Sequence, residues 1–358
     1  MEDRQQHALA LKRALDARFL RKGIATAIIS GVCYGLFTTF LNLGLGEGVW
    51  AQWAAGAVSV FVLTYVVSAM GSAMMYTASS LWSLALTIAQ GKFTDLLRSI
   101  NTKPGRMIIL AALLGGPIAG TLYVIALQKA GSIVIPITAL NPAIGAILAR
   151  IFYKQALTPR MLLGIGVCFA SSVMIGASSL GADAPEGMFA GVVLAFLAAI
   201  GWGLEGTIAG YSTAIIDYQI GITIRQFIAG VSNLIIVLPL LGVVAGEGWG
   251  YSWQLFGQAL TDGASLPAFI ASGFFALFAY SLWYKGNSMC GAALGMACNS
   301  AYSFWGPFFC WIVLGVICGK SGWTIPAIGW LSAVVMVLGI FIIAVDPRTL
   351  FKKGGRAQ

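Results

Sequence analysis

Residues 192–212 read VVLAFLAAIGWGLEGTIAGYS and place one carboxylate, Glu205, in an otherwise apolar stretch. About 20 apolar residues in a helix are enough to cross the ~30 Å hydrocarbon core of a bilayer. A charged side chain near the middle of such a helix costs about 2.5–3.5 kcal/mol on insertion scales, so it normally faces a cavity or a partner. The stretch therefore predicts a membrane-spanning helix in which Glu205 is paired or functional.

The composition of the whole chain is that of an integral membrane protein. Of its 358 residues, 59% are hydrophobic and 9% are charged, and the mean hydropathy is +0.88. A soluble domain carries roughly 25% charged residues. The net charge of +9 does not indicate a nucleic-acid partner, because the basic residues form short clusters between apolar segments. That pattern sets orientation in a membrane.

Reactive residues are few and scattered. The only histidine, His7, lies in the N-terminal tail, so no histidine-based metal site or catalytic triad can form within the membrane. The six cysteines lie in apolar runs without a CxxC pair and are expected to be small core residues. The sequence contains no P-loop for ATP and no HExxH or paired-carboxylate motif. We therefore expect no enzyme activity, no cofactor and no metal.

The apolar segments predict ten membrane-spanning helices, which start near residues 23, 51, 107, 131, 160, 188, 219, 267, 290 and 325. Residues 51–90 would be ~60 Å long as one helix. Either this span bends at Gly71 and continues along the interface, or residues 73–90 cross again. The charges favour one crossing, because with ten spans only Lys129 and Lys320 among the basic residues fall outside. The prediction is a cytoplasmic (inner) membrane protein with both termini in the cytoplasm.

The spans fall into two halves, residues 23–180 and 188–346, between an amphipathic N-terminal segment (1–22) and a basic tail (347–358). CYGL at 33–36 matches GWGL at 201–204, and TLYVIALQKAG at 121–131 matches SLWYKGNSMCG at 281–291. Halves with an odd number of spans insert in opposite directions, and inverted repeats allow two conformations open to opposite sides of the membrane. The predicted fold class is all-α integral membrane, with ten transmembrane helices as two inverted five-helix repeats.

These motifs resemble the ten-helix members of the drug/metabolite transporter superfamily. The resemblance rests on the aromatic-Gly-Leu motif in the first helix of each half and on the proline-bearing fourth helix, IPITALNPAIGAIL at 135–148. It covers roughly residues 23–346 and implies a central cavity lined by the first four helices of each half, with the fifth and tenth helices peripheral. The long segment at 72–106 and the outer loop at 244–266 depart from the simplest members.

The stretch around Glu205 carries a second resemblance. GWGLEG at 201–206 is similar to the membrane-glutamate motif of the small multidrug resistance proteins, four-span relatives in which the glutamate exchanges protons for a cationic substrate. The resemblance implies that Glu205 binds a proton or a cation, with Trp202 on the same helical face as an aromatic wall. The residues alone leave two other roles open. Arg225 lies at about the same depth in the seventh span, so the two can form a structural ion pair, and Glu205 can also face water at the inner mouth.

Two further spans combine proline with polar side chains. The fourth holds Pro136, Asn141 and Pro142, and the ninth holds Asn299, Ser300, Tyr302 and Pro307. Paired discontinuities in equivalent helices point to a transporter site, so we expect Asn141, Asn299 and Tyr302 to line the cavity. Packed asparagines in kinked helices are the structural alternative.

Aromatic residues and glycines complete the list of candidates. Tyr34 and Tyr280 are candidate cavity residues, whereas Trp283 and Tyr284 are expected in an interfacial belt beside Lys285. The glycines around Pro117 (Gly115, Gly116 and Gly120) predict close helix packing. The outer-loop aromatics Trp249, Tyr251 and Trp253 are expected to anchor an interfacial segment.

Together these features favour a secondary transporter that moves a small polar organic solute by alternating access. A cationic or zwitterionic amine is the favoured substrate, with Glu205 as a candidate site of proton coupling. With Glu205 and Arg225 as a structural pair, a neutral or anionic solute becomes the alternative, and a non-transporting membrane sensor is a third. The expected partners are the lipid bilayer and the solute, and the oligomeric state, a homodimer included, is left undecided.

Overall fold

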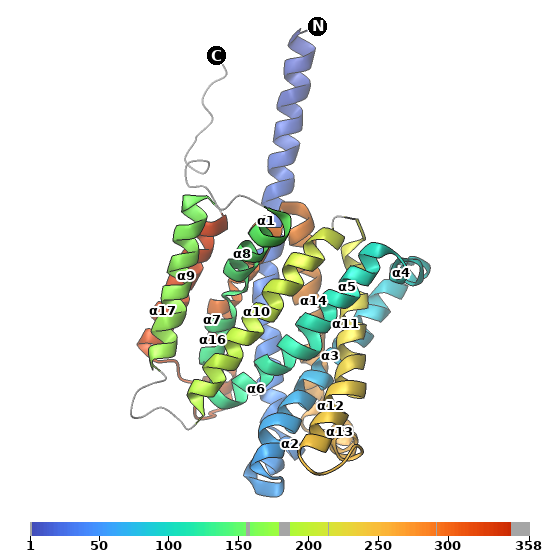
Figure 1. Cartoon of the computed structure of the whole chain (residues 1–358), viewed down its shortest axis with the longest axis vertical. Coiled ribbons are helices and arrows are strands. Elements are labelled where there is room, and N and C mark those ends of the chain that lie inside the picture. Colours follow the sequence, from blue (N-terminus) through green and yellow to red (C-terminus); the bar gives the residue numbers. More distant parts are fainter. Residues whose placement is uncertain (1, 155–157, 179–186, 214, 291, 345–358) are drawn as a thin grey trace.

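The computed structural model describes residues 2–154, 158–178, 187–213, 215–290 and 292–344. The secondary structure of these ranges is helical (Figure 1). The elements of the first half are α1 Glu2–Leu45, α2 Gly48–Gln52, η1 Trp53–Ala57, η2 Val62–Val67, α3 Ser68–Ala89, α4 Phe93–Ile100, α5 Lys103–Leu113, η3 Leu114–Gly120, α6 Thr121–Ala130, η4 Gly131–Ile133, α7 Val134–Thr138, α8 Asn141–Tyr153 and α9 Pro159–Ser178. Those of the second half are α10 Met188–Ser212, α11 Tyr218–Ser232, η5 Asn233–Val237, α12 Leu238–Val244, α13 Tyr251–Thr261, α14 Leu266–Cys290, α15 Ala292–Asn299, α16 Tyr302–Cys310, η6 Trp311–Ile317 and α17 Ala327–Ala344.

Five described helices are long and apolar enough to cross a membrane. They are Arg18–Leu45, Lys103–Ala130, Met188–Ser212, Tyr218–Val244 and Leu266–Cys290. Shorter apolar helices run over Asn141–Phe152, Pro159–Ser171, Tyr302–Ile317 and Ala327–Ile342. An all-α chain with membrane-helix character is therefore confirmed.

Several long helices contain a π-helical turn. In one of them, η3 joins α5 to α6 and contains Pro117. Proline has no N–H to donate and its ring clashes with the preceding turn, so the helix widens locally instead of keeping its regular ladder. The widened turn carries Gly115 and Gly116, and it lies against α10 and α11.

The segment between residues 51 and 90 differs from both alternatives considered above. The chain leaves the helical conformation at Gly56, where φ is +110°, and then runs as continuous helix from Val62 to Ala89 through η2 and α3. The expected bend at Gly71 is wrong, because Gly71 is buried inside α3 with Leu45 packed against it. At 1.5 Å per residue this run is roughly 42 Å long, enough for one crossing, and it extends from the end with α2 to the end with α4 (Figure 1).

The N-terminal segment is helical, as the sequence predicts. It is the first part of α1, whose 44 residues form one helix, and this part projects beyond the bundle (Figure 1). It continues the axis of the first apolar helix and does not turn along the surface of the bundle. The basic tail at 347–358 lies outside the described residues.

Helices of the two halves pack against each other in a reciprocal way. α1 contacts α14, α15 and α16, whereas α10 contacts α6, α7 and α8. α3 and α11 contact each other. α9 and α17 pack together at one edge of the bundle (Figure 1), which agrees with the peripheral position expected for the fifth and tenth helices. The centre of the bundle therefore lies between α1, α6, α10 and α14.

Candidate functional site

Glu205 on α10 and Arg225 on α11 form a fully buried ion pair. Nε of Arg225 donates to Oε1 of Glu205 at 2.7 Å, and Nη2 donates to Oε2 at 3.1 Å. Both side chains are 0% exposed. The two parallel bonds have the bidentate geometry that makes arginine–carboxylate pairs strong and specific in orientation. The ion pair allowed by the sequence is formed, and Glu205 does not face water here.

Glycine on the neighbouring helix makes room for this carboxylate. A Cβ atom added to Gly115 would overlap the carboxylate of Glu205. Gly116 lies in the same way against Ala229, and Gly120 lies against the hydroxyl of Tyr76. The expected close packing around Pro117 is confirmed. The absence of a side chain at Gly115 leaves the space that the side chain of Glu205 fills.

The guanidinium group of Arg225 has further partners. Nη1 donates to Oε1 of Gln226 at 2.7 Å, and Nε2 of Gln226 donates to Oγ of Ser79 at 2.7 Å. The ring of Tyr280 lies 3.8 Å from the guanidinium carbon, measured to the ring centroid. Tyr284 donates a hydrogen bond of 3.4 Å to Oε1 of Glu205. These contacts give both charged groups hydrogen-bond partners within the protein.

A small cavity lies beside the ion pair. It is lined by Tyr34, Asn141, Trp202, Ala279, Tyr280, Trp283 and Asn299. Its volume is about 10 Å³, room for about one water molecule. Tyr280 connects the two features, because it lines the cavity and also carries Arg225 on its ring. Six of the seven predicted site residues thus line this cavity or form the ion pair beside it: Tyr34, Asn141, Trp202, Asn299, Glu205 and Arg225.

The fourth and ninth apolar segments are both interrupted at this cavity. α7 ends at Thr138 and α8 begins at Asn141, whereas α15 ends at Asn299 and α16 begins at Tyr302. Nδ2 of Asn141 donates to the hydroxyl of Tyr302 at 3.1 Å, so the two interruptions meet. The paired discontinuities expected in these two segments are present. The first directly precedes Pro142, whereas Pro307 lies inside α16 and not at the second. The side chain of Pro136 lies outside the described part.

Ring stacking and hydrogen bonds hold Tyr302, Asn299 and Trp202 in place. Tyr302 is buried and stacks on Tyr34, with the ring centroids 4.1 Å apart. Oγ of Ser30 donates to Oδ1 of Asn299 at 2.6 Å. Nε1 of Trp202 donates to the carbonyl oxygen of Gly115 at 2.9 Å. This hydrogen bond to the carbonyl oxygen of Gly115, in the widened turn η3, holds Trp202 in the cavity wall.

The interfacial belt expected at Trp283 and Tyr284 is wrong. Both side chains are buried, with exposed fractions of 5% and 0%. α14 continues past Lys285 to Cys290, and a long lysine side chain can reach the interface from within a span. The internal repeat could have predicted this burial. TLY at 121–123 matches SLW at 281–283, which pairs Trp283 with Tyr123, and Tyr123 is also buried.

The outer-loop aromatics agree with an interfacial role. α13 contains Trp253, which is 50% exposed and donates through Nε1 to the carbonyl oxygen of Leu234 at 2.8 Å. Trp249, just before α13, is 63% exposed.

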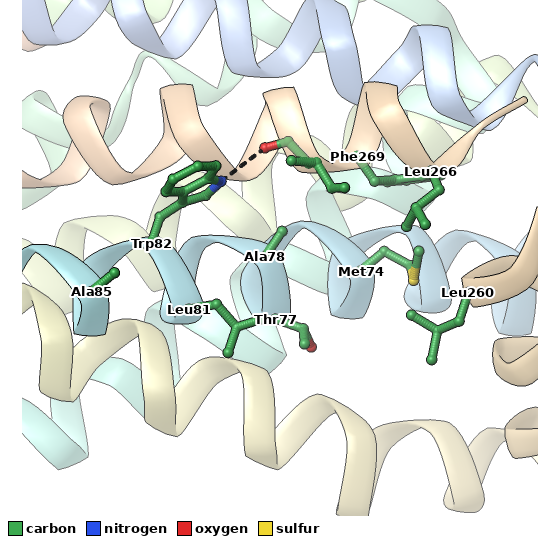
Figure 2. A pocket seen from close by; sticks show the side chains of 10 residues that line it. Met74, Thr77, Ala78, Leu81, Trp82, Ala85, Leu260, Leu266 and Phe269 are labelled. Carbon is green, nitrogen blue, oxygen red and sulfur yellow. Dashed lines mark hydrogen bonds between the residues drawn. The ribbon is translucent and has the colours of Figure 1, made fainter. Parts of the chain in front are cut away.

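A larger hollow of about 440 Å³ lies elsewhere, between α3, α14 and the end of α13 (Figure 2). Met74, Leu81, Leu260, Leu266 and Phe269 are among its lining residues. Nε1 of Trp82 donates to the carbonyl oxygen of Ile270 at 3.3 Å across it. This lining is almost entirely apolar and contains none of the predicted site residues, so it offers little to recognise a polar solute.

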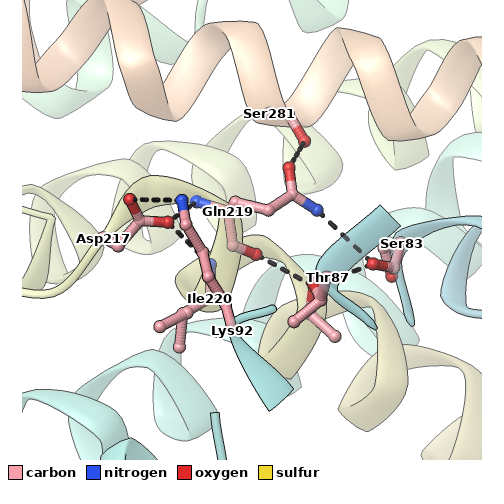
Figure 3. Close-up of polar contacts among 8 residues, drawn as sticks. Ser83, Thr87, Lys92, Asp217, Gln219, Ile220 and Ser281 are labelled. Atoms are coloured by element: carbon pink, nitrogen blue, oxygen red, sulfur yellow. Dashed lines mark hydrogen bonds and ion pairs between the residues drawn. The ribbon is translucent and has the colours of Figure 1, made fainter. Parts of the chain in front are cut away.

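A polar layer at the end of the bundle near α4 was not predicted from the sequence (Figure 3). Nζ of Lys92 pairs with Oδ2 of Asp217 at 2.9 Å. Oγ of Ser281 donates to Oε1 of Gln219 at 3.3 Å, and Nε2 of Gln219 donates to the carbonyl oxygen of Ser83 at 3.5 Å. These bonds tie α3 to α11 and α14 near this end of the bundle.

Comparisons with known proteins support the fold. No family model matches the sequence, and no curated protein matches it. Solved structures do match; one crystal structure is similar over 92% of this chain and 99% of that chain, with a TM-score of 0.52 and 18% sequence identity. At this identity the similarity concerns the arrangement of the helices over nearly the full length of both chains.

Proposed function

We propose that the chain crosses the cytoplasmic membrane ten times, as two inverted five-helix repeats, and is a secondary transporter of a small polar organic solute. The five long apolar helices would supply half of the crossings. η2 with α3, α7 with α8, α9, α15 with α16, and α17 would supply the others. The reciprocal contacts of α1 and α10 support the repeat. The resemblance to the drug/metabolite transporter superfamily belongs to this proposal, as does the cytoplasmic position of both termini.

The observation that carries the proposal is the meeting of two interrupted helices at one central cavity. Asn141 and Asn299 stand at the interruptions, one from each half, and both line the cavity. Irregular backbone at membrane depth is tolerated where it is buried in protein or lines a cavity. In transporters built from inverted repeats, interrupted helices mark the solute site near the bilayer midplane.

The buried ion pair bears on the substrate class. Because Glu205 and Arg225 neutralise each other, neither charge is free to bind a solute in this conformation. That favours a solute without net charge over the cationic amine expected from the likeness to small multidrug resistance proteins. A cation remains the second candidate because aromatic rings line the cavity and can bind cations.

Flux into proteoliposomes tests the proposal. Vesicles with purified protein would be loaded with a mixture of metabolites and assayed by mass spectrometry for protein-dependent, saturable exchange. We expect exchange of at least one polar solute, and loss of that exchange in Asn141→Ala and Asn299→Ala. Asn101→Ala is the matched control, because Asn101 is an exposed residue between α4 and α5. No exchange of any solute by a protein that still binds one would favour a sensor instead.

A further inference from the structure

Two tryptophan indoles line the cavity, and the N–H group of only one of them has a hydrogen-bond acceptor among the described residues. Nε1 of Trp202 has its partner in the carbonyl oxygen of Gly115. Nε1 of Trp283 is buried and has no hydrogen-bond partner among the described residues. An indole N–H can only donate, and a buried donor without an acceptor costs about 1–3 kcal/mol. Trp283 thus brings to the cavity lining an indole N–H that lacks an acceptor among the described residues.

The other polar groups of the cavity point to the same chemistry. The hydroxyl of Tyr34 makes no hydrogen bond within 3.5 Å to the described part of the chain. Ser30 engages one end of the Asn299 amide, and Tyr302 engages one end of the Asn141 amide. In the orientations that these bonds define, the NH₂ group of Asn299 is left as a donor and Oδ1 of Asn141 is left as an acceptor.

The cavity wall itself carries no charge. Its seven residues are aromatic, amide or alanine side chains. The nearest described charges are those of Glu205 and Arg225, which are paired with each other. A solute with net charge would lose its hydration without gaining a counter-charge, and that transfer is costly at low dielectric.

We infer that the site takes a small solute without net charge that places a carbonyl or hydroxyl oxygen on Nε1 of Trp283 and a donor on Oδ1 of Asn141. This inference rests on the proposed function and specifies its substrate class as amides, polyols or similar neutral oxygen compounds. A simple alkylammonium ion has no acceptor for Trp283. A site built to hydrogen-bond a polar group discriminates strongly against ligands that lack it, because its own buried groups then stay unpaired.

The test follows the indole N–H groups of ¹⁵N-tryptophan-labelled protein in lipid nanodiscs by NMR. Acetamide and glycerol are the uncharged probes, and ethylammonium and tetramethylammonium are the cations of similar size. The signal of Trp283 is assigned by its loss in Trp283→Phe, or in Trp283→Tyr if the first variant does not fold. Trp50 is the internal control, because its Nε1 is also buried without a described partner but lies in α2, away from the cavity.

We expect an uncharged probe to shift the Trp283 signal saturably while the cations do not, and Trp50 to stay unchanged. Trp283→Phe should weaken that probe about tenfold, the equivalent of one lost hydrogen bond. A saturable shift with the cations alone, or a Trp283 signal that no uncharged probe moves at saturating concentration, overturns the inference. Binding at Trp283 without flux would contradict transport and leave the ligand class intact. Flux of a cation with the Trp283 signal unchanged would support transport and contradict the inferred ligand class.

Discussion

Arg225 is fully buried, and the described residues supply hydrogen-bond acceptors on all sides of its guanidinium group. Each of its three guanidinium nitrogens donates a hydrogen bond, two of them to Glu205 and one to Gln226. Removing one partner of a buried ion pair leaves the other charge unpaired in a medium that cannot solvate it. The pair therefore fixes α10 on α11.

We predict that Glu205→Gln and Arg225→Gln each lower the stability by about 3–5 kcal/mol, because each leaves one unpaired buried charge. The double variant should lose clearly less than the sum, since both charges are then gone. Unfolding in mixed micelles measures this cycle. Single variants as stable as the wild type would mean that water reaches the pair.

Gly115 gives a second prediction at single-residue scale. Gly115→Ala places a methyl group where the carboxylate of Glu205 lies, and such overpacking costs about 1–3 kcal/mol. The matched control is Gly166→Ala in α9, where an added Cβ meets nothing within 4 Å. We expect the control to melt at the wild-type temperature or slightly above, because alanine favours helix over glycine. Equal behaviour of the two variants in a thermal melt would contradict the packing argument.

The helical elements show which parts of the site a sequence can predict. The interruption at Asn141 was predictable, because Pro142 follows it directly and disturbs a helix through local bonds. The interruption at Asn299 has no proline beside it, because Pro307 lies inside α16. The break at Gly56 gave only a weak local signal, since an isolated glycine is compatible with a helix. The pairing of Lys92 with Asp217 joins residues far apart in the chain, and periodicity contains no information about such a contact. Burial of Trp283 was hidden by its neighbour Lys285 and visible only through the repeat.

At the same scale, Asp262 joins two elements on the end opposite α4. It accepts hydrogen bonds from N–H of Val49 at 3.2 Å and N–H of Ser265 at 3.1 Å, at the starts of α2 and α14. The hydroxyl of Ser265, with these N–H groups, holds the pKa of Asp262 below its ordinary value of 3.8. A lowered pKa means that this stabilisation is complete above the ordinary pKa and is lost as the pH falls through the lowered one.

We therefore predict that Asp262→Asn melts below the wild type at pH 7, and that the gap narrows as the pH falls below about 4, near the ordinary pKa of aspartate. Asp95→Asn is the control, because Asp95 makes only an exposed ion pair with Arg98 at 3.8 Å, a kind of contact worth little. Thermal melts across this pH range measure the effect. A gap that stays constant with pH would show that the charge of Asp262 is not what stabilises the junction.

On the scale of the whole molecule, a partly exposed ion pair joins the two halves near each end of the bundle. Lys92 pairs with Asp217 at one end, and Lys320 pairs with Glu47 at 2.7 Å at the other. The central cavity between them is too small for a solute larger than water. Alternating access would require the two ends to open in turn, and each opening would break the ion pair at that end. Each pair should therefore disfavour the state that is open at its own end by the small free energy of the pair.

Lys92→Gln tests this balance, because it removes the ion pair and leaves Asp217 to accept from N–H of Gln219 at the start of α11. A partly exposed pair is worth up to about 1 kcal/mol, which corresponds to a population shift of up to about fivefold. We expect faster hydrogen–deuterium exchange over residues 83–92 and 215–223, with exchange around Glu47 and Lys320 unchanged or slower. Lys103→Gln is the control, since Lys103 is an exposed lysine at the start of α5. Equal acceleration at both ends would mean that Lys92 stabilises the bundle as a whole, and the polar layer in Figure 3 would then be a structural contact and not a gate.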